Sequence, residues 1–257
     1  MSRIMRRAKP ASDVLDAARM NLPDEQDNNQ RVLLTLCVDL SSSMQGEPIK
    51  RLNAALLELR NTLRNDIELS SKAMVCLISF GHGGVVAWCG NRPVRPGESP
   101  FVGASQFQPP TLEAGGVTPM VEAVELGMTL IAEEKRRLRA RSLGLYRPVF
   151  WCIGDGCPTD DTGHYCDDWR RLPPVIAAHE AKKRFVFFSV SVGDIGAQGE
   201  EVFNTLAPDS HVRMQDFDFA TAVKLVSDSV EESAHNASAP EMKRRMMERA
   251  QRRVEMI

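Results

Sequence analysis

Oxygen-bearing side chains follow the first long apolar stretch of the chain. The run 32–38 ends at Asp39, and Ser41 and Ser43 come next at alternate positions. This spacing across a tight loop allows the three side chains to converge on one point, and Gly46 permits backbone turns that other residues resist. Carboxylate and hydroxyl oxygens are hard ligands, so the group favours a small divalent cation over zinc.

Two distant positions carry the same kind of donor. Asp155 follows a second apolar run at 148–153, and Thr118 follows a pair of glycines just before a helical pattern. In a doubly wound sheet, ligands bind outside the carboxyl ends of the strands, where the winding direction reverses. The sequence therefore predicts a site for Mg²⁺, with Mn²⁺ or Ca²⁺ as alternatives, at one edge of a sheet.

Strand and helix patterns alternate through most of the chain. The alternation predicts an α/β fold with a doubly wound, mostly parallel sheet, helices on both faces, and one antiparallel edge strand in a hairpin over 73–89. Strands are expected at 32–38, 73–80, 85–89, 148–153, 185–192 and 211–214, and helices at 48–63, 118–138, 168–183, 199–206, 216–232 and 241–255.

The chain divides into three expected parts. Residues 1–30 form a polar N-terminal extension with a helix-capable piece at 12–20, residues 31–232 form the α/β domain, and residues 233–257 carry a charged C-terminal helix. Residues 90–117 contain five prolines and little periodicity. Such a stretch is either functional or a mobile surface insertion, and the sequence leaves both open.

Composition is that of an ordinary soluble protein. Hydrophobic residues make up 43%, and the net charge of −2 gives no overall case for nucleic acid or an acidic membrane. No apolar run approaches a membrane span, and the basic N-terminus is a poor signal peptide. Cys37, Cys76 and Cys152 lie inside apolar runs. These features predict a cytoplasmic protein with reduced, buried cysteines.

Some positions have a purely structural interpretation as well as a functional one. Thr118 stands where it could cap the following helix as well as bind a metal. Cys157, His164 and Cys166 lie close together. A soft-metal site there would need a fourth ligand such as His179, and the spacing matches no zinc pattern, so none is expected.

Two further segments are open to a structural and a functional interpretation. The basic run 135–141 ends a predicted helix, where cations suit the helix dipole, so a solvated helix end is favoured over nucleic-acid contact. Met242, Met246 and Ala250 form a narrow apolar stripe on the last helix. The stripe is expected to dock on the domain itself rather than on a partner.

Three segments together resemble the metal-ion-dependent adhesion site (MIDAS) of von Willebrand factor A (vWA) domains. They are DLSSS at 39–43, Thr118 after its two glycines, and GDGCPTD at 154–160. The resemblance covers about residues 31–232 and is closest to bacterial TerY-type proteins of tellurium-resistance and stress-response gene clusters. It implies that Ser41, Ser43 and Thr118 coordinate the ion through hydroxyls, with Asp39 and Asp155 acting largely through bound water.

The resemblance also implies a function. An Asp or Glu of a partner protein, such as a kinase or phosphatase of the same gene cluster, would complete the coordination, and the chain would act as a scaffold or adaptor in a stress or defence system. Two alternatives remain open: a Mg²⁺-dependent phosphatase-like hydrolase, and nucleic-acid binding through basic tails. The hydrolase would need a second carboxylate as general acid at the position of Ser41, so no enzymatic activity is expected.

Overall fold

The computed structural model describes residues 30–215 and 217–254, and these form one α/β layered structure. The expected helix at 12–20 and residues 1–29 of the N-terminal extension lie outside the described residues. In the part described, no helix is both long enough and apolar enough to span a membrane. All six cysteines are free, and Cys37, Cys76 and Cys152 are buried as expected.

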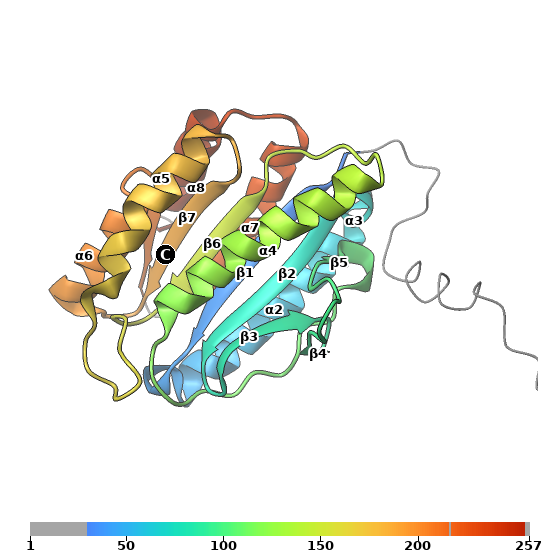
Figure 1. Cartoon of the computed structure of the whole chain (residues 1–257). Coiled ribbons are helices and arrows are strands. Elements are labelled where there is room, and N and C mark those ends of the chain that lie inside the picture. Colours follow the sequence, from blue (N-terminus) through green and yellow to red (C-terminus); the bar gives the residue numbers. More distant parts are fainter. Residues whose placement is uncertain (1–29, 216, 255–257) are drawn as a thin grey trace, which may run out of the picture.

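A single mixed sheet forms the centre of the fold (Figure 1). Within the described residues the strands are β1 (Val32–Leu40), β2 (Ala73–Gly81), β3 (Gly84–Cys89), β4 (Arg92–Pro93), β5 (Val102–Gly103), β6 (Val149–Gly154), β7 (Val186–Val192) and β8 (His211–Met214). Their order is β4-β3-β2-β1-β6-β7-β8, with β5 beside β2.

Parallel pairing runs through the middle of this sheet. Strands β2, β1, β6, β7 and β8 pair in parallel, whereas β3, β4 and β5 pair in antiparallel fashion at one side. Every residue of β1, β2, β6 and β7 is buried, which is the pattern of strands covered on both faces. The predicted fold class and the hairpin over 73–89 are confirmed.

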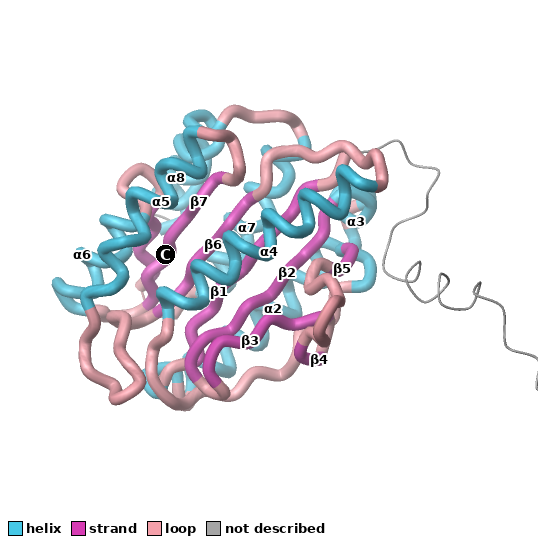
Figure 2. Tube along the Cα trace, in the orientation of Figure 1, coloured by secondary structure: helices cyan, strands magenta, loops and turns pink. Residues whose placement is uncertain are grey.

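Helices cover both faces of the sheet (Figure 2). On one face lie α2 (Glu47–Asn65), α3 (Ile67–Lys72), α7 (Phe219–Ala234) and α8 (Ala239–Val254), and on the other α4 (Met120–Ala140), α5 (Leu172–Ala181) and α6 (Gly196–Leu206). Pro48 stands in the first turn of α2, where a missing N–H costs nothing. The chain leaves β1 for α2 on one face and reaches β6 through α4 on the other, so the winding reverses between β1 and β6.

Three features of the middle of the chain differ from expectation. The short helix α3 was not predicted; the Asp66 side chain caps it by accepting a hydrogen bond from the Leu69 N–H at 2.8 Å. The irregular stretch 90–117 contains β4 and β5, which extend the antiparallel side of the sheet. Residues 167–171 form a 3₁₀ turn before α5, because two prolines start that helix late.

The last helix docks on the domain. Met242, Met246 and Ala250 are buried in the core cluster beneath α7, as the apolar stripe predicted. Ion pairs flank this contact: the Glu232 carboxylate on α7 pairs with Arg245 and, at 2.9 Å, with Arg249. Helix α8 therefore presents its apolar stripe to its own domain rather than to solvent.

Candidate metal centre

Asp39 lies at the carboxyl end of β1 with almost no exposed surface. Its Oδ1 accepts a hydrogen bond from the Ser41 N–H at 2.7 Å, and its Oδ2 is buried without a hydrogen-bond partner. Burial, and after it the charge of Asp155, raise the pKa of Asp39 to about 7. A carboxylate oxygen without a hydrogen-bond partner destabilises a protein interior, and a cation bound beside it would offset that cost.

A chain of hydroxyls joins Asp155 to the loop after β1. The Ser43 Oγ donates to Asp155 Oδ1 at 2.8 Å, and the Ser41 and Ser43 hydroxyls lie 3.0 Å apart. Burial raises the pKa of Asp155 above its usual value, although Ser43 works against this shift. Ser41 is buried and Ser43 is exposed, so the group has a buried floor and a rim open to solvent.

Thr118 lies between the two loops. Its N–H donates to Thr159 Oγ1 at 2.8 Å, and its carbonyl accepts from the Thr159 N–H at 3.1 Å. Two residues earlier, the Gly116 carbonyl accepts hydrogen bonds from both the N–H and the hydroxyl of Ser42. These contacts tie the segment of Thr118 to the loop of Asp155 on one side and to the serine loop on the other.

The expected capping role of Thr118 is wrong. Helix α4 begins at Met120, its N-cap is Pro119, and no side-chain capping bond is formed. The Thr118 carbonyl instead accepts from the Met120 N–H at 2.8 Å. Since the hydroxyl does not serve the helix, it stays available for the proposed metal.

Several residues that shape the centre were missed in the sequence. Gly154 precedes Asp155, and a Cβ there would lie 3.0 Å from Asp39 Oδ2. Gly81 has a φ of 128°, and a Cβ there would lie 2.4 Å from the Leu40 carbonyl carbon. Asn53 on α2 exchanges two hydrogen bonds with the Leu112 backbone and holds the end of the 90–117 stretch. A glycine as the last residue of a strand, as at Gly81 and Gly154, is a signal that the sequence offers, whereas no sequence signal indicates the contact of Asn53.

The donor set fits a hard divalent cation. Two carboxylates and up to three hydroxyls supply oxygen ligands only, as Mg²⁺, Mn²⁺ and Ca²⁺ prefer. Within the described residues no three His, Cys, Asp or Glu side chains gather around one point, so a site rich in charged ligands is not found there. The unpartnered Oδ2 of Asp39 supports the fit, and ligation by the five residues Asp39, Ser41, Ser43, Thr118 and Asp155 stays a prediction.

The nearby cysteines and histidine have other contacts. The His164 Nδ1 lies 2.7 Å from the Thr162 hydroxyl, and the Cys166 Sγ accepts from the Asp168 N–H at 3.4 Å. Burial raises the pKa of the Cys157 thiol, which disfavours the thiolate that binds soft metals.

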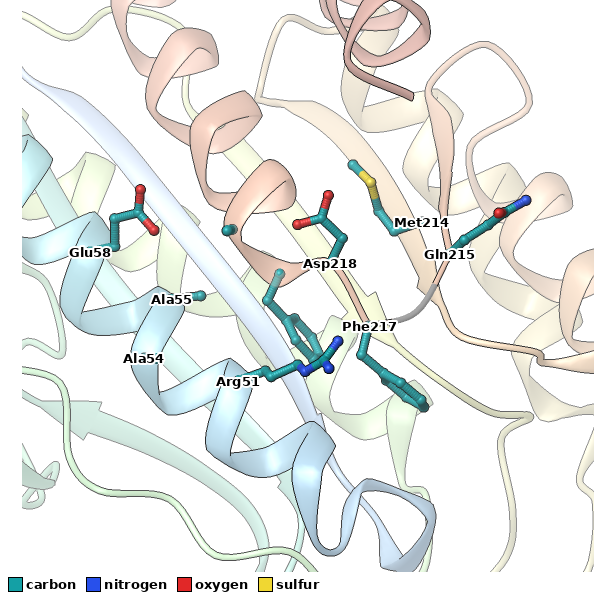
Figure 3. A pocket seen from close by; sticks show the side chains of 10 residues that line it. Arg51, Ala54, Ala55, Glu58, Met214, Gln215, Phe217 and Asp218 are labelled. Carbon is teal, nitrogen blue, oxygen red and sulfur yellow. The ribbon is translucent and has the colours of Figure 1, made fainter. Parts of the chain in front are cut away.

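A pocket of about 640 Å³ lies between α2 and the segment that joins β8 to α7 (Figure 3). Its lining includes Arg51, Glu58, Met214 and Phe219, and none of the five proposed metal ligands belongs to it. This pocket is therefore separate from the candidate metal centre.

Solved structures share this fold at low sequence identity, while no protein-family model and no curated protein matches the chain. SpaC, a pilus adhesin of Lactobacillus rhamnosus GG, is 14% identical with a TM-score of 0.53, over 84% of this chain and 31% of SpaC. The chain has a vWA/Rossmann-like fold.

Two other solved structures are less similar in shape. The mussel byssus proximal thread matrix protein 1 is 13% identical with a TM-score of 0.46, over 81% of this chain and 47% of its own. The manganese-loaded TRAP protein of Plasmodium vivax is 17% identical with a TM-score of 0.41, over 76% of this chain and 72% of its own. The chain thus spans less than half of SpaC and of the mussel protein.

Proposed function

We propose that this chain is a metal-dependent protein–protein interaction module and not an enzyme. The observation that carries the proposal is the joined set of Asp39, Ser41, Ser43 and Asp155, in which a buried carboxylate oxygen lacks a partner beside a line of hydroxyls. The set spans the switch point between β1 and β6, where open α/β sheets bind ligands.

The chemistry of the donors favours a carboxylate from outside. A divalent cation held by two carboxylates and neutral hydroxyls would keep an electrophilic position for a partner's Asp or Glu. Ser43 and Ser42 are exposed at the rim, so an incoming side chain reaches the centre from solvent. SpaC is described as a pilus adhesin, and binding to another molecule is the kind of role proposed here.

The hydrolase alternative lacks a carboxyl group at the position of its general acid. Ser41 stands where a phosphatase with Asp39 as nucleophile would need a general acid, and a serine hydroxyl cannot perform that step near neutral pH. The other carboxylate, Asp155, accepts a hydrogen bond from Ser43. The proposal therefore assigns both carboxylates to the metal.

The wider role rests on the sequence resemblance alone. We propose a scaffold of the TerY type in a bacterial stress-response or tellurium-resistance system, located in the cytoplasm, with a kinase or phosphatase as one partner. The partner would supply an acidic side chain, and neither a membrane nor nucleic acid would be required.

Matched serine variants test the proposal. Ser43→Ala removes a proposed ligand, whereas Ser42→Ala removes a neighbouring exposed hydroxyl that donates a hydrogen bond to the Gly116 carbonyl. Calorimetric titration with Mn²⁺ should show one site in the parent and in Ser42→Ala, and at least tenfold weaker binding in Ser43→Ala. Equal affinity in both variants would contradict the site.

A second measurement separates binding from catalysis. Proteins that the immobilised parent retains with Mg²⁺ should elute with EDTA, and Thr118→Asn should not retain them, because its side chain offers poor geometry to the ion. Hydrolysis of generic phosphate esters that disappears in Asp39→Asn would instead support the enzyme.

A further inference from the structure

A second, positively charged pocket lies at the opposite edge of the sheet from the candidate metal centre. Its volume is about 490 Å³, and its walls come from the end of α4, the segment between α4 and β6, the turn before β7, and the end of α7. Helix α4 begins beside Thr118 and has 21 residues. At 1.5 Å per residue it separates the two sites by about 30 Å.

The lining carries four cations and no carboxylate. The cations are Lys135, Arg139, Arg147 and Lys183. The Lys135 Nζ donates to the Arg184 carbonyl at 3.2 Å. The side chains of the other three form no ion pair or hydrogen bond with any residue in the described ranges, so no side chain there neutralises their charges.

Two acidic side chains on the helices around the pocket are engaged elsewhere. Glu180, near the end of α5, pairs with Lys243 at 2.9 Å and accepts from the Phe187 N–H. Glu134, on α4, accepts hydrogen bonds from Ser99 and Arg137. Neither carboxylate lines the pocket.

Helix dipoles offset only part of this charge. Helices α4, α5 and α7 all end near the pocket, and each C-terminus is equivalent to about −0.5 elementary charge. Three such ends sum to about −1.5 against +4 from the lining cations. Cations at a helix C-terminus are common, but the positive charge of this lining exceeds the charge that the three helix dipoles offset by more than two elementary charges.

The cations also repel one another. Burial, followed by the charges of Arg139, Arg184 and Arg147, lowers the pKa of Lys135 below its usual value. The His179 pKa is likewise lowered, first by burial and then by Arg184, Lys182 and Lys135. An anion with several charges would relieve this repulsion at once.

We propose that this pocket binds a compact polyanion with clustered phosphate groups, such as a nucleoside polyphosphate or an inorganic oligophosphate. Arginine guanidinium groups and lysine ammonium groups are the side chains that recognise phosphate, and small-ligand pockets have volumes of this order. The four cations come from three separate segments around one hollow, which suits a compact ligand better than an extended strand. The inference does not depend on the metal centre.

Calorimetric titration with inorganic triphosphate tests the pocket in metal-free buffer that contains EDTA, so that chelation of a metal contributes nothing. The double variant Arg139→Gln/Arg147→Gln removes two lining charges. The control Lys224→Gln/Arg252→Gln removes the same charge from exposed positions on α7 and α8 that do not line the pocket. ATP is titrated in parallel, to show whether a base adds affinity beyond that of the phosphates.

The expected result is one saturable site in the parent and the control, weakened at least tenfold in the double variant. If the double variant does not fold, Lys183→Asn provides a milder test, because Asn tolerates the positive φ of 54° at this position. Equal affinities in the double variant and the control would overturn the proposal. Non-saturable binding, or tighter binding of duplex DNA with a steep salt dependence, would overturn it too.

Discussion

Asp39 should couple the proposed metal binding to pH, and the sign of this coupling follows from the burial of its carboxylate. Burial raises its pKa to about 7 in the folded chain, from an ordinary value of 3.8. Between these two values the folded state binds more protons than the unfolded chain, so the stability of the metal-free protein falls as pH rises. Below this window the carboxyl is protonated in both states and costs nothing; above it the full cost is present.

The magnitude follows from the shift. Each pKa unit corresponds to about 1.4 kcal/mol, so ionised Asp39 destabilises the metal-free fold by up to about 4 kcal/mol. A cation bound at this centre would compete with the proton for the Asp39 carboxylate. At about pH 6 roughly nine-tenths of the metal-free protein has a protonated Asp39, which weakens apparent metal affinity about tenfold and removes about 1.4 kcal/mol of metal-induced stabilisation.

Thermal melting with Mg²⁺ and with EDTA, at about pH 6 and about pH 8, measures this linkage. The rise in melting temperature with Mg²⁺ should be larger at the higher pH. The matched variant is Asp39→Asn, whose amide oxygen can still accept from the Ser41 N–H. It should lose both the Mg²⁺ response and the part of the pH slope that Asp39 causes.

Two results would refute the reasoning. The first is an Mg²⁺ response of equal size at both pH values, since proton competition would then be absent. The second is the same pH slope in the parent and in Asp39→Asn without metal, because the slope would then belong to other groups.

Three further changes have expected outcomes. Gly154→Ala places a Cβ about 3.0 Å from Asp39 Oδ2, so the variant should fold but lose at least tenfold in Mn²⁺ affinity by calorimetry. Asn53→Ala leaves the Leu112 N–H and carbonyl without their partner and should cost about 1–3 kcal/mol in urea unfolding. Met246→Ala opens a cavity under α8 and should cost about 2–5 kcal/mol, with Mn²⁺ affinity unchanged.

The sequence predicts the ends of the central strands well because burial on both faces leaves a continuous apolar run. The run before Asp39 and the run before Asp155 are strands β1 and β6, and they are neighbours in the sheet. From that pairing alone the two carboxylates must approach each other at the switch point. The prediction therefore succeeds where a local pattern is joined to a general rule of topology.

It fails where the deciding contact is remote in the chain. Thr118 is of a residue type that often caps helices, yet its N–H and carbonyl form hydrogen bonds with Thr159, which is 41 residues away. The residues close to Thr118 in the sequence give no indication of that partner. The two-residue strand β5 is missed for the same reason, since its pairing with β2 joins segments that share no local pattern.

The hydrogen bonds among the hydroxyls and carboxylates of the centre are compatible with a bound cation. The Ser43 hydroxyl donates its proton to Asp155 and accepts one from the Ser41 hydroxyl at 3.0 Å, which leaves one Ser43 lone pair for a metal, so the bond to Asp155 can persist with the cation present. The Ser41 N–H can likewise keep its bond to one oxygen of Asp39 while the other oxygen gains an electrostatic partner. Since neither bond must break, the backbone of the two loops would need little rearrangement to accept the proposed ion. Neutralisation of the charge on the buried carboxylates would then be the main contribution to the free energy of metal binding. Because pH sets that charge, metal affinity should depend on pH.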